Sequence, residues 1–343
     1  MTLEVRLADL KHDGGPLLKL LHSELSGNID SARFEWLYRS GPHGEGKAWL
    51  AHELHSGELM GVAAAFPRQI FVSGKVEMGC VLGDFCVSPK YRSLGPALQL
   101  QRRCMEAIST GNQNGEFSRG YDLPSTSMLA VYKRLGVQIN VPFVRMTRLL
   151  RSRRKVESRV GPGAAANAVS AVIDAVLSLS GGSRVAHSDA KIAMWRERFG
   201  DEFTQLADRV RDQWGVCTNR SADFLNWRYL DHPKRKYQVA TARRGGKLAG
   251  YVIWERNEDK MTIADWYAEE PREVRLDLIR AVVARAKTEG AESVNISVPG
   301  GHEFQRDLES LGFRARESSP LIFLGNGCQT AERWLLLDGD RES

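Results

Sequence analysis

The sequence predicts an α+β protein built from two similar halves, and three observations support this prediction. The chain has 343 residues, which is enough for two domains that each bury a core. Residues 31–61 resemble residues 221–250, with an offset of 191 residues between Trp36 and Trp227. Strand-like and helix-like segments then follow in the same order in both halves. A period this long indicates a duplicated domain; the alternative is two unrelated aromatic helices that each run into a hairpin.

The elements of the first half follow from periodicity. Residues 1–10 alternate like a strand, and residues 81–87 form a continuous apolar run typical of a buried strand. Residues 97–108 carry apolar side chains at helical spacing, and a second helix over 125–135 ends at Gly136, a plausible left-handed cap. A last strand is expected over 142–150.

The second half repeats this order. We expect a strand over 261–267, a helix over 271–290, a strand over 293–298 and a helix over 304–311. The connection between the halves is expected to hold helices over 166–179 and 189–214. A Gly-Pro-Gly sequence at 161–163 marks the boundary. We therefore divide the chain into residues 1–150, a basic linker with connecting helices at 151–215, and residues 216–343.

The net charge of +6 lies in one place. Residues 145–159 hold seven basic side chains and one glutamate, so the remainder of the chain is balanced. This distribution argues against a general nucleic-acid-binding protein and favours a solvated linker. A narrower alternative is that the cluster borders an anionic ligand.

Other classes are excluded by what the sequence lacks. Apolar runs stay shorter than a membrane span, and residues 1–10 lack a signal-peptide core, so we expect a cytoplasmic protein without membrane contact. The five cysteines contain no Cys-x-x-Cys and the eight histidines no His-Glu-x-x-His. We therefore expect neither disulfides nor a bound metal.

The segment over residues 83–97 predicts a site for a phosphate group. A strand ends there, a turn follows, and a helix begins near Gly95 and Pro96. Glycine lets backbone N–H groups converge, the helix N-terminus adds unpaired N–H groups, and proline is tolerated in a first helical turn. The segment is therefore suited to binding a pyrophosphate.

Two motifs resemble those of the GNAT superfamily of N-acyltransferases. Residues 92–97 read Arg-x-x-Gly-x-Ala and follow Val-x-Pro-x-Tyr at 87–91, which is similar to the acyl-CoA signature of that family. Residues 132–136 read Tyr-x-x-x-Gly, where the family continues with phenylalanine and this chain has Val137. The resemblance implies two tandem GNAT-like domains, each with a twisted, mainly antiparallel sheet flanked by helices.

The resemblance also implies where acyl-CoA binds. In this family the sheet opens between its fourth and fifth strands, here 81–87 and 117–121, and the pantetheine arm enters the gap. Related sequences often carry asparagine where this chain has Ser125. The implied cofactor-binding residues are Phe85, Cys86, Val87, Arg92, Ser93, Leu94, Gly95, Pro96, Ala97 and Ser125.

The chemistry requires an acid and usually a base, because an amine with a pKa near 10 must lose a proton and a thiolate leaving group gains one. By resemblance Tyr132 is the acid, and a core aromatic is the alternative. Asp84, a carboxylate within an apolar strand, is the first candidate for the base, and a structural ion pair is equally open. Glu77 and His52 are weaker candidates. Backbone N–H groups near Cys86 would stabilise the oxyanion, and direct transfer is favoured over a covalent intermediate on that cysteine.

Two further segments do not add an active site. Residues 41–48 fit Gly-x-x-x-x-Gly-Lys, but alanine follows the lysine and the order of helix and strand is reversed for a nucleotide-binding loop. In the second half, residues 268–274 are acidic where the first half has its glycine loop, and Leu308 stands where the first half has Tyr132. The second half is thus expected to be degenerate.

The sequence therefore predicts an enzyme that transfers an acetyl or short acyl group from acyl-CoA to a small amine, such as an amino sugar or sugar nucleotide. Its partners would be acyl-CoA and that amine, and nucleic acid is not expected. The alternatives are an aminoacyl-tRNA-dependent peptidyl transferase of the cell-wall type and a noncatalytic acyl-CoA sensor. The sequence gives no oligomeric state.

Overall fold

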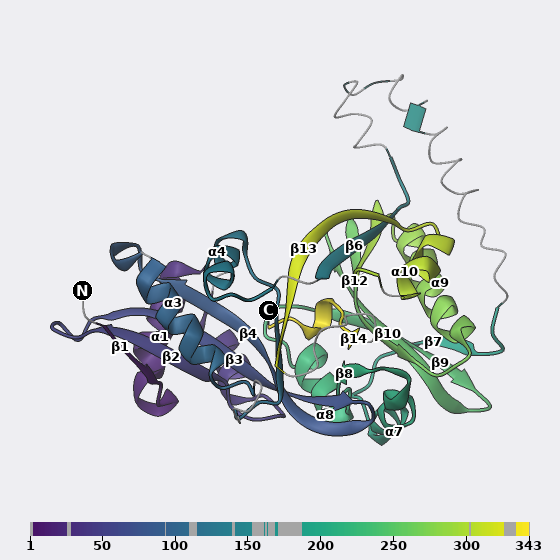
Figure 1. Ribbon diagram of the computed structural model, residues 1–343. Coiled ribbons are helices and arrows are strands. Elements are labelled where there is room, and N and C mark those ends of the chain that lie inside the picture. Colours follow the sequence, from purple (N-terminus) through teal and green to yellow (C-terminus); the bar gives the residue numbers. More distant parts are fainter. Residues whose placement is uncertain are drawn as a thin grey trace.

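A single mixed β-sheet forms the frame of the molecule in the computed structural model (Figure 1). The structure describes residues 3–25, 29–92, 94–109, 115–138, 141–152, 161, 163, 169–170, 187–301, 303–325 and 334–342. Within these residues the main strand order is β1-β2-β3-β4-β5-β13-β6-β12-β11-β10-β9-β7. The α+β class predicted from the sequence is confirmed.

In the described part of the first half there are six strands and the helices that cover them. Figure 1 shows β1 to β4 and their helices in purple to blue on one side of the molecule, whereas β6 lies on the other side beside β12 and β13. Its elements are β1 (Leu3–Leu7), α1 (Leu10–Glu24), α2 (Ser31–Phe34), the π-helix η1 (Glu35–Arg39), β2 (Lys47–Glu53), β3 (Leu59–Val72), β4 (Lys75–Val87), the 3-10 helix η2 (Pro89–Tyr91), α3 (Leu94–Met105), β5 (Arg119–Asp122), α4 (Thr126–Arg134) and β6 (Val141–Leu149).

The second half repeats much of this order. Its elements are β7 (Lys191–Trp195), α7 (Asp201–Val210), the 3-10 helix η3 (Arg211–Gln213), β8 (Val216–Thr218), α8 (Ala222–Leu225), the π-helix η4 (Asn226–Leu230), β9 (Tyr237–Arg244), β10 (Lys247–Asn257), β11 (Lys260–Ala268), α9 (Arg272–Thr288), β12 (Ser293–Pro299), α10 (Glu303–Ser310), β13 (Arg314–Gly325), β14 (Trp334–Leu335) and the 3-10 helix η6 (Asp338–Asp340).

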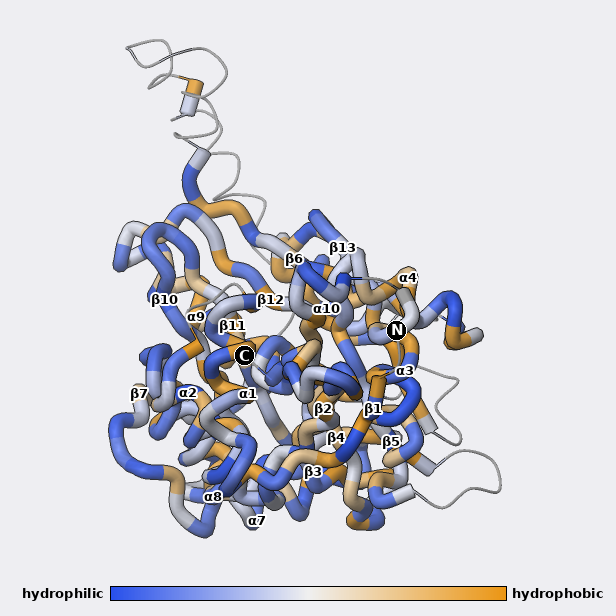
Figure 2. The backbone as a smooth tube through the Cα atoms, turned by 90° about the vertical axis from the view of Figure 1, so that its left-hand side faces the viewer, coloured by the Kyte–Doolittle hydropathy of each residue, from blue (hydrophilic) through white to orange (hydrophobic). Residues whose placement is uncertain are grey.

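Helices cover both faces of β3 because its side chains alternate between them. Val62 and Ala64 belong to the core that includes Leu17 of α1, whereas Ala63 belongs to the core that includes Leu100 of α3. This alternation is the period of two that an extended strand imposes. Figure 2 shows many hydrophilic residues in the outer turns, where the chain leaves these cores.

The strand β6 links the two halves instead of closing the first. It pairs with β12 on one side and with β13 on the other. The long β13 then pairs with β5 through residues 322–325, after pairing with β6 through residues 314–321. The strand pairing therefore crosses the boundary expected near residue 150.

Some expected elements differ from those in the structure. A helix was expected over 189–214, but the first part of this range forms β7, an edge strand paired with β9. The helix α7 starts only after Gly200, where Asp201 and Glu202 favour a first helical turn. The helix α1 was not expected, since Gly14, Gly15 and Pro16 weaken its helical pattern. The helix expected over 166–179 lies outside the described residues, apart from 169–170.

The two segments that resemble each other in sequence lie against each other at the junction of the halves. Trp36 of η1 donates its indole N–H to the carbonyl of Trp227 at 2.8 Å, and Trp227 of η4 donates to the carbonyl of Trp36 at 3.0 Å. The two rings stack with centroids 4.7 Å apart. Such reciprocal contacts are typical of two equivalent surfaces related by twofold symmetry, and they support the duplication that the sequence predicts.

Replacing Trp36 by alanine tests the importance of this contact. We expect Trp36→Ala to lower the free energy of unfolding by about 3–5 kcal/mol, because it leaves a cavity and an unpaired carbonyl at Trp227. Denaturant unfolding measures this change. Leu54→Ala, at a half-exposed position, is the control and should stay within about 0.5 kcal/mol of the parent. Equal effects of the two substitutions would contradict a central role for the tryptophan pair.

Candidate functional site

Two adjoining cavities lie beside β4, and each has a volume of about 520 Å³. The strand-gap cavity is lined by Glu24, Leu25, Phe85, Cys86, Val87, Arg92, Ala97, Ser125, Ser127, Met128 and Val131. The junction cavity lies toward the second half and is lined by residues that include Arg33, Asp84, Asp122, His232, Lys234, Arg235 and Glu342. Leu25, Phe85, Ser125 and Met128 line both cavities.

The strand-gap cavity exists because β4 and β5 diverge. They pair in parallel only from Gly79 to Val81 on the β4 side. Farther along β4 the register with β3 shifts between Val62 and Ala64, which is a β-bulge, and Asp84 has a positive φ of 44°. A bulge bends a strand and increases its twist, so the end of β4 turns away from β5. Residues 85–87 therefore line the gap.

The predicted phosphate loop leads from this cavity into α3. Arg92 and Ala97 line the cavity, and Arg92 lies 3.8 Å from Glu24. Gly95 and Pro96 stand in the first turn of α3, and an added Cβ at Gly95 would meet nothing within 4 Å. Ser93 lies outside the described residues, as does the side chain of Leu94.

Ser125 lies where the two cavities meet because it caps α4. Its hydroxyl accepts from the backbone N–H of Met128 at 3.4 Å, as an N-cap serine does. The same hydroxyl lies 2.9 Å from that of Ser127. The helix that follows carries Tyr132 at its inner face.

Tyr132 is fully buried and belongs to a hydrogen-bonded chain of three side chains. Its hydroxyl donates to Asp122 Oδ2 at 2.5 Å and accepts from Gln101 Nε2 at 2.8 Å. Burial and the neighbouring Asp122 raise the pKa of Tyr132 well above its usual value. The phenol thus keeps its proton at neutral pH.

Asp122 was not identified from the sequence. It ends β5 and lines the junction cavity, together with Gln101. Burial raises the pKa of Asp122 to about 7, and the hydrogen bond from Tyr132 opposes that rise. A carboxyl group with a pKa near 7 can exchange protons with a bound substrate at neutral pH. Its place at the end of a strand beside the expected gap was the signal available in the sequence.

Asp84 lies in the ion pair that was the alternative to a role as base. Arg33 donates to both of its carboxylate oxygens, at 3.0 and 2.9 Å, and Tyr38 donates to Oδ2 at 3.0 Å. The second half contains a similar arrangement, since Tyr229 donates to Asp265 Oδ2 at 3.0 Å. The offset between the two tyrosines is again 191 residues.

The C-terminal segment crosses from the second half to the junction cavity (Figure 1). Arg220, which is buried, bonds to Asp265 at 2.9 Å and to Asp340 at 2.9 Å. The hydroxyl of Tyr121 donates to the carbonyl of Asp340 at 2.7 Å. Two residues farther along, Glu342 lines the junction cavity. Burial and the nearby Asp84 raise the pKa of Glu342.

The same segment fills the gap in the second half. There β11 and β12 pair from Lys260 to Ile263 on the β11 side, and η6 packs against both strands. Space at Gly339 is so limited that an added Cβ would lie 3.0 Å from the carbonyl oxygen of Ala264. The gap between β11 and β12, which corresponds to the strand-gap cavity of the first half, is thus occupied by η6.

The remaining candidate residues lie in less suitable surroundings. Glu77 lies 3.6 Å from Arg119, and burial lowers the pKa of His52 on β2. Burial raises the pKa of Cys86 to about 12, so its thiol is protonated at neutral pH and is a poor nucleophile.

The basic cluster is described only in part. Arg145 bonds to Glu317 at 2.6 Å, and Arg148 is buried. Residues 153–160, which include the other cluster residues except Arg151, lie outside the described residues. In the described part of the chain, His, Cys, Asp and Glu side chains do not gather in threes at a possible metal site, and none of the helices is long and apolar enough to cross a membrane.

Comparisons with known proteins place the fold. No family model matches the sequence, and neither does any curated protein. Among solved structures, a probable N-acyltransferase from Enterococcus faecalis V583 matches with a TM-score of 0.64 at 14% identity. The match covers 94% of this chain and 72% of the Enterococcus chain. A GCN5-related N-acetyltransferase from Anabaena variabilis has a TM-score of 0.65 at 11% identity with the same two coverages.

A third similar structure is the N-myristoyltransferase of Saccharomyces cerevisiae with bound myristoyl-CoA. Its TM-score is 0.55 at 12% identity, and the match covers 94% of this chain and 82% of that one. The sequence motifs, the diverging β4 and β5 and these matches agree. The chain therefore has the fold of the GNAT-type N-acyltransferases.

Proposed function

We propose that this protein transfers an acyl group from acyl-CoA to the amine of a small molecule. The observation that carries the proposal is that the two cavities share four lining residues, and that the junction cavity is also lined by a carboxyl group with a pKa near 7. A donor in the first cavity and an acceptor in the second would meet at Phe85, Ser125 and Met128. The similar N-myristoyltransferase, which binds an acyl-CoA, supports this choice of donor.

The donor would be bound mainly by backbone groups. The pantetheine arm would lie along residues 85–87, and the pyrophosphate would accept hydrogen bonds from the N-terminus of α3, beside Arg92. A backbone N–H near Cys86 would stabilise the oxyanion that forms as the amine attacks. Acetyl or another short acyl group fits the small-amine chemistry that the sequence predicts.

We assign the role of base to Asp122. Its carboxylate would accept the proton of the bound ammonium group, the neutral nitrogen would attack the thioester carbonyl, and the C–S bond would break to release the thiolate. Tyr132 would hold this carboxylate in place through its bond at 2.5 Å, and Gln101 would in turn hold the Tyr132 hydroxyl through a bond at 2.8 Å. Tyr132 would supply the proton that the thiolate takes up and would regain one from Asp122 through their hydrogen bond. The Asp122 carboxylate would then accept the second proton from the acylated nitrogen and later release it to water. Asp84 would instead fix Arg33 at the wall of the cavity.

Acyl transfer itself is tested by mixing the protein with acetyl-CoA and a panel of amines and detecting free thiol. Amino sugars and sugar nucleotides are the first acceptors to examine. Acetylated product, identified by mass spectrometry, would separate transfer from hydrolysis of the thioester. Tight binding of acetyl-CoA without transfer to any amine in the panel would favour a noncatalytic sensor.

The phosphate loop is tested at Gly95. We expect Gly95→Glu to weaken acetyl-CoA binding at least about tenfold in calorimetry, because a carboxylate would repel the pyrophosphate. Gly95→Ala is the matched control and should bind nearly as well as the parent, because there is open space around this position. Unchanged affinity in the glutamate variant would show that the cofactor binds elsewhere.

The roles of Asp122 and Tyr132 are separated by the pH dependence of turnover. In the parent, kcat should rise as the pH increases through about 7, because Asp122 must lose its proton to act as base. Tyr132→Phe should lower kcat and also move this rise to higher pH, since it removes a hydrogen bond that lowers the pKa of Asp122. A lower kcat with the rise at the same pH would make Tyr132 an acid alone. An unchanged kcat and pH profile would remove Tyr132 from the mechanism.

The raised pKa of Asp122 also predicts how stability varies with pH. Between about pH 4 and 7 the folded protein keeps a proton that the unfolded chain loses, so this group lowers stability as the pH rises, by up to about 1.4 kcal/mol per pH unit. Asp122→Asn should abolish that contribution. The free energy of unfolding of this variant should therefore increase relative to that of the parent as the pH rises from 4 to 7. Asp208→Asn, at an exposed position, is the control. Parallel stability curves for the parent and Asp122→Asn would contradict the shift.

A further inference from the structure

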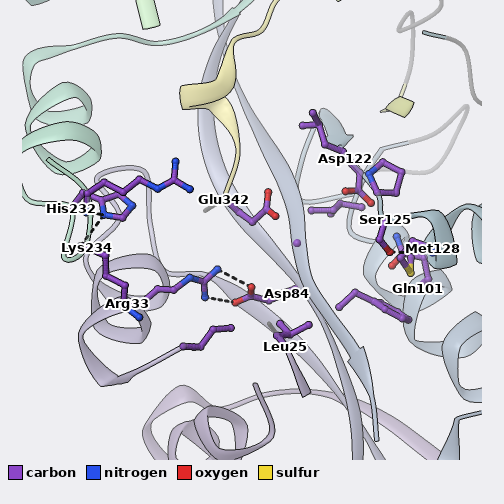
Figure 3. Close-up of a pocket in the computed structure, with 18 residues that line it drawn as sticks. Leu25, Arg33, Asp84, Gln101, Asp122, Ser125, Met128, His232, Lys234 and Glu342 are labelled. Carbon is purple, nitrogen blue, oxygen red and sulfur yellow. Dashed lines mark hydrogen bonds and ion pairs between the residues drawn. The ribbon is translucent and has the colours of Figure 1, made fainter. Parts of the chain in front are cut away.

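The junction cavity has different chemistry at its two ends (Figure 3). Asp122, Gln101 and Ser125 lie at the end nearer the strand-gap cavity, while His232 and Lys234 lie on the opposite side. The second end comes from the loop after η4, in the second half of the chain. One end therefore carries the carboxyl group of Asp122 and the other carries donors, while Asp84 and Glu342 line the cavity between them.

His232 presents an N–H donor at the second end. Its Nδ1 accepts from the backbone N–H groups of Lys234 and Arg235, both at 3.1 Å. A neutral imidazole that accepts at Nδ1 carries its proton on Nε2. This Nε2 is buried and has no hydrogen-bond partner among the residues that the structure describes. The ring is held against Trp36, with centroids 4.4 Å apart.

The surroundings of His232 are electropositive. Burial lowers its pKa to about 3, with further lowering from Arg228, Arg235 and Arg33. The ring therefore stays neutral at physiological pH, and its Nε2–H stays a donor. Cationic groups that suppress a nearby positive charge favour a negative charge at the same place.

Two cations of the loop are positioned by acidic neighbours at the protein surface. Lys234 lies 3.1 Å from Asp30, and Arg235 lies 3.3 Å from Glu255. The side chains of Asp30 and Glu255 are 46% and 22% exposed, so water screens both pairs. These contacts hold the two cations at the wall of the cavity, where their positive charge acts on an anion inside it.

We propose that the acceptor is a primary amine that also carries a carboxylate or phosphate group. This inference rests on the proposed function. The anionic group would accept from His232 Nε2–H and lie beside Lys234 and Arg235, while the amine would lie at Asp122. An anion at the second end would satisfy a buried donor that has no other partner among the described residues. Pairing at both ends would also fix which atom of the acceptor faces the thioester.

The proposal is tested with matched amines that differ in the anionic group. Amino acids are compared with their amides, and glucosamine 6-phosphate with glucosamine, by thiol release from acetyl-CoA. We expect the anionic member of at least one pair to have a kcat/KM at least about tenfold higher, and the pair that shows this preference identifies carboxylate or phosphate as the bound group. Equal values in both pairs would overturn this inference but leave acyl transfer intact. An absence of transfer to every amine, with acetyl-CoA bound, would overturn both.

Variants of the loop locate the anion. Lys234→Gln should raise KM for the preferred anionic amine about tenfold and leave KM for its neutral partner and the affinity for acetyl-CoA unchanged. Lys236→Gln is the matched control, because Lys236 is an exposed neighbour on the same loop and is not among the residues that line the junction cavity. His232→Phe keeps an aromatic ring against Trp36 but removes both the Nε2 donor and the Nδ1 acceptor of the loop, so KM for the anionic amine should again rise more than KM for its neutral partner. Equal KM increases for both amines in Lys234→Gln would show that the loop acts only through structure.

Discussion

The reciprocal bond between Trp36 and Trp227 is the constraint on which the arrangement of the two halves depends. Each indole N–H is satisfied by the backbone of the other tryptophan, so neither half can shift without leaving buried polar groups unpaired. The guanidinium groups of Arg68 and Arg228 lie over these rings, at 5.0 and 5.4 Å from the centroids. His232 packs on the same stack. The wall that the second half gives to the junction cavity is therefore fixed by the contact that joins the halves.

The second half contributes residues to the wall of the junction cavity, although the gap between its own strands β11 and β12 is filled. The Arg220–Asp265–Asp340 cluster is fully buried, and removing one partner would leave an uncompensated charge. This cluster anchors η6 between β11 and β12, and it thereby directs Glu342 toward the first half. A single structural feature thus closes one gap and completes the wall of the other.

Local structure was predictable from the sequence, whereas contacts across the chain were not. The loop at 92–97 and the helices that contain Ala97 and Tyr132 were found because glycine, proline and apolar spacing act over a few residues. Asp122 was missed because its pKa depends on burial by elements far away in the sequence, and Glu342 because 258 residues separate it from Asp84. The pairing of β6 with β12 and β13 could not be predicted either, because the residue pattern of a strand does not identify the strands that pair with it.

The crossing of strands between the halves limits how this protein can be divided. A fragment that ended at residue 150 would carry β6 without β12 and β13, and β5 would lose its pairing with β13. Exposed edges of this kind recruit strands from other molecules, so such a fragment would tend to aggregate. Because β6 pairs with strands of the second half and β13 pairs with β5 of the first, the two halves are expected to unfold as one cooperative unit. Replacement of one half by a homologous domain would therefore require β6 and β13 to be replaced as well.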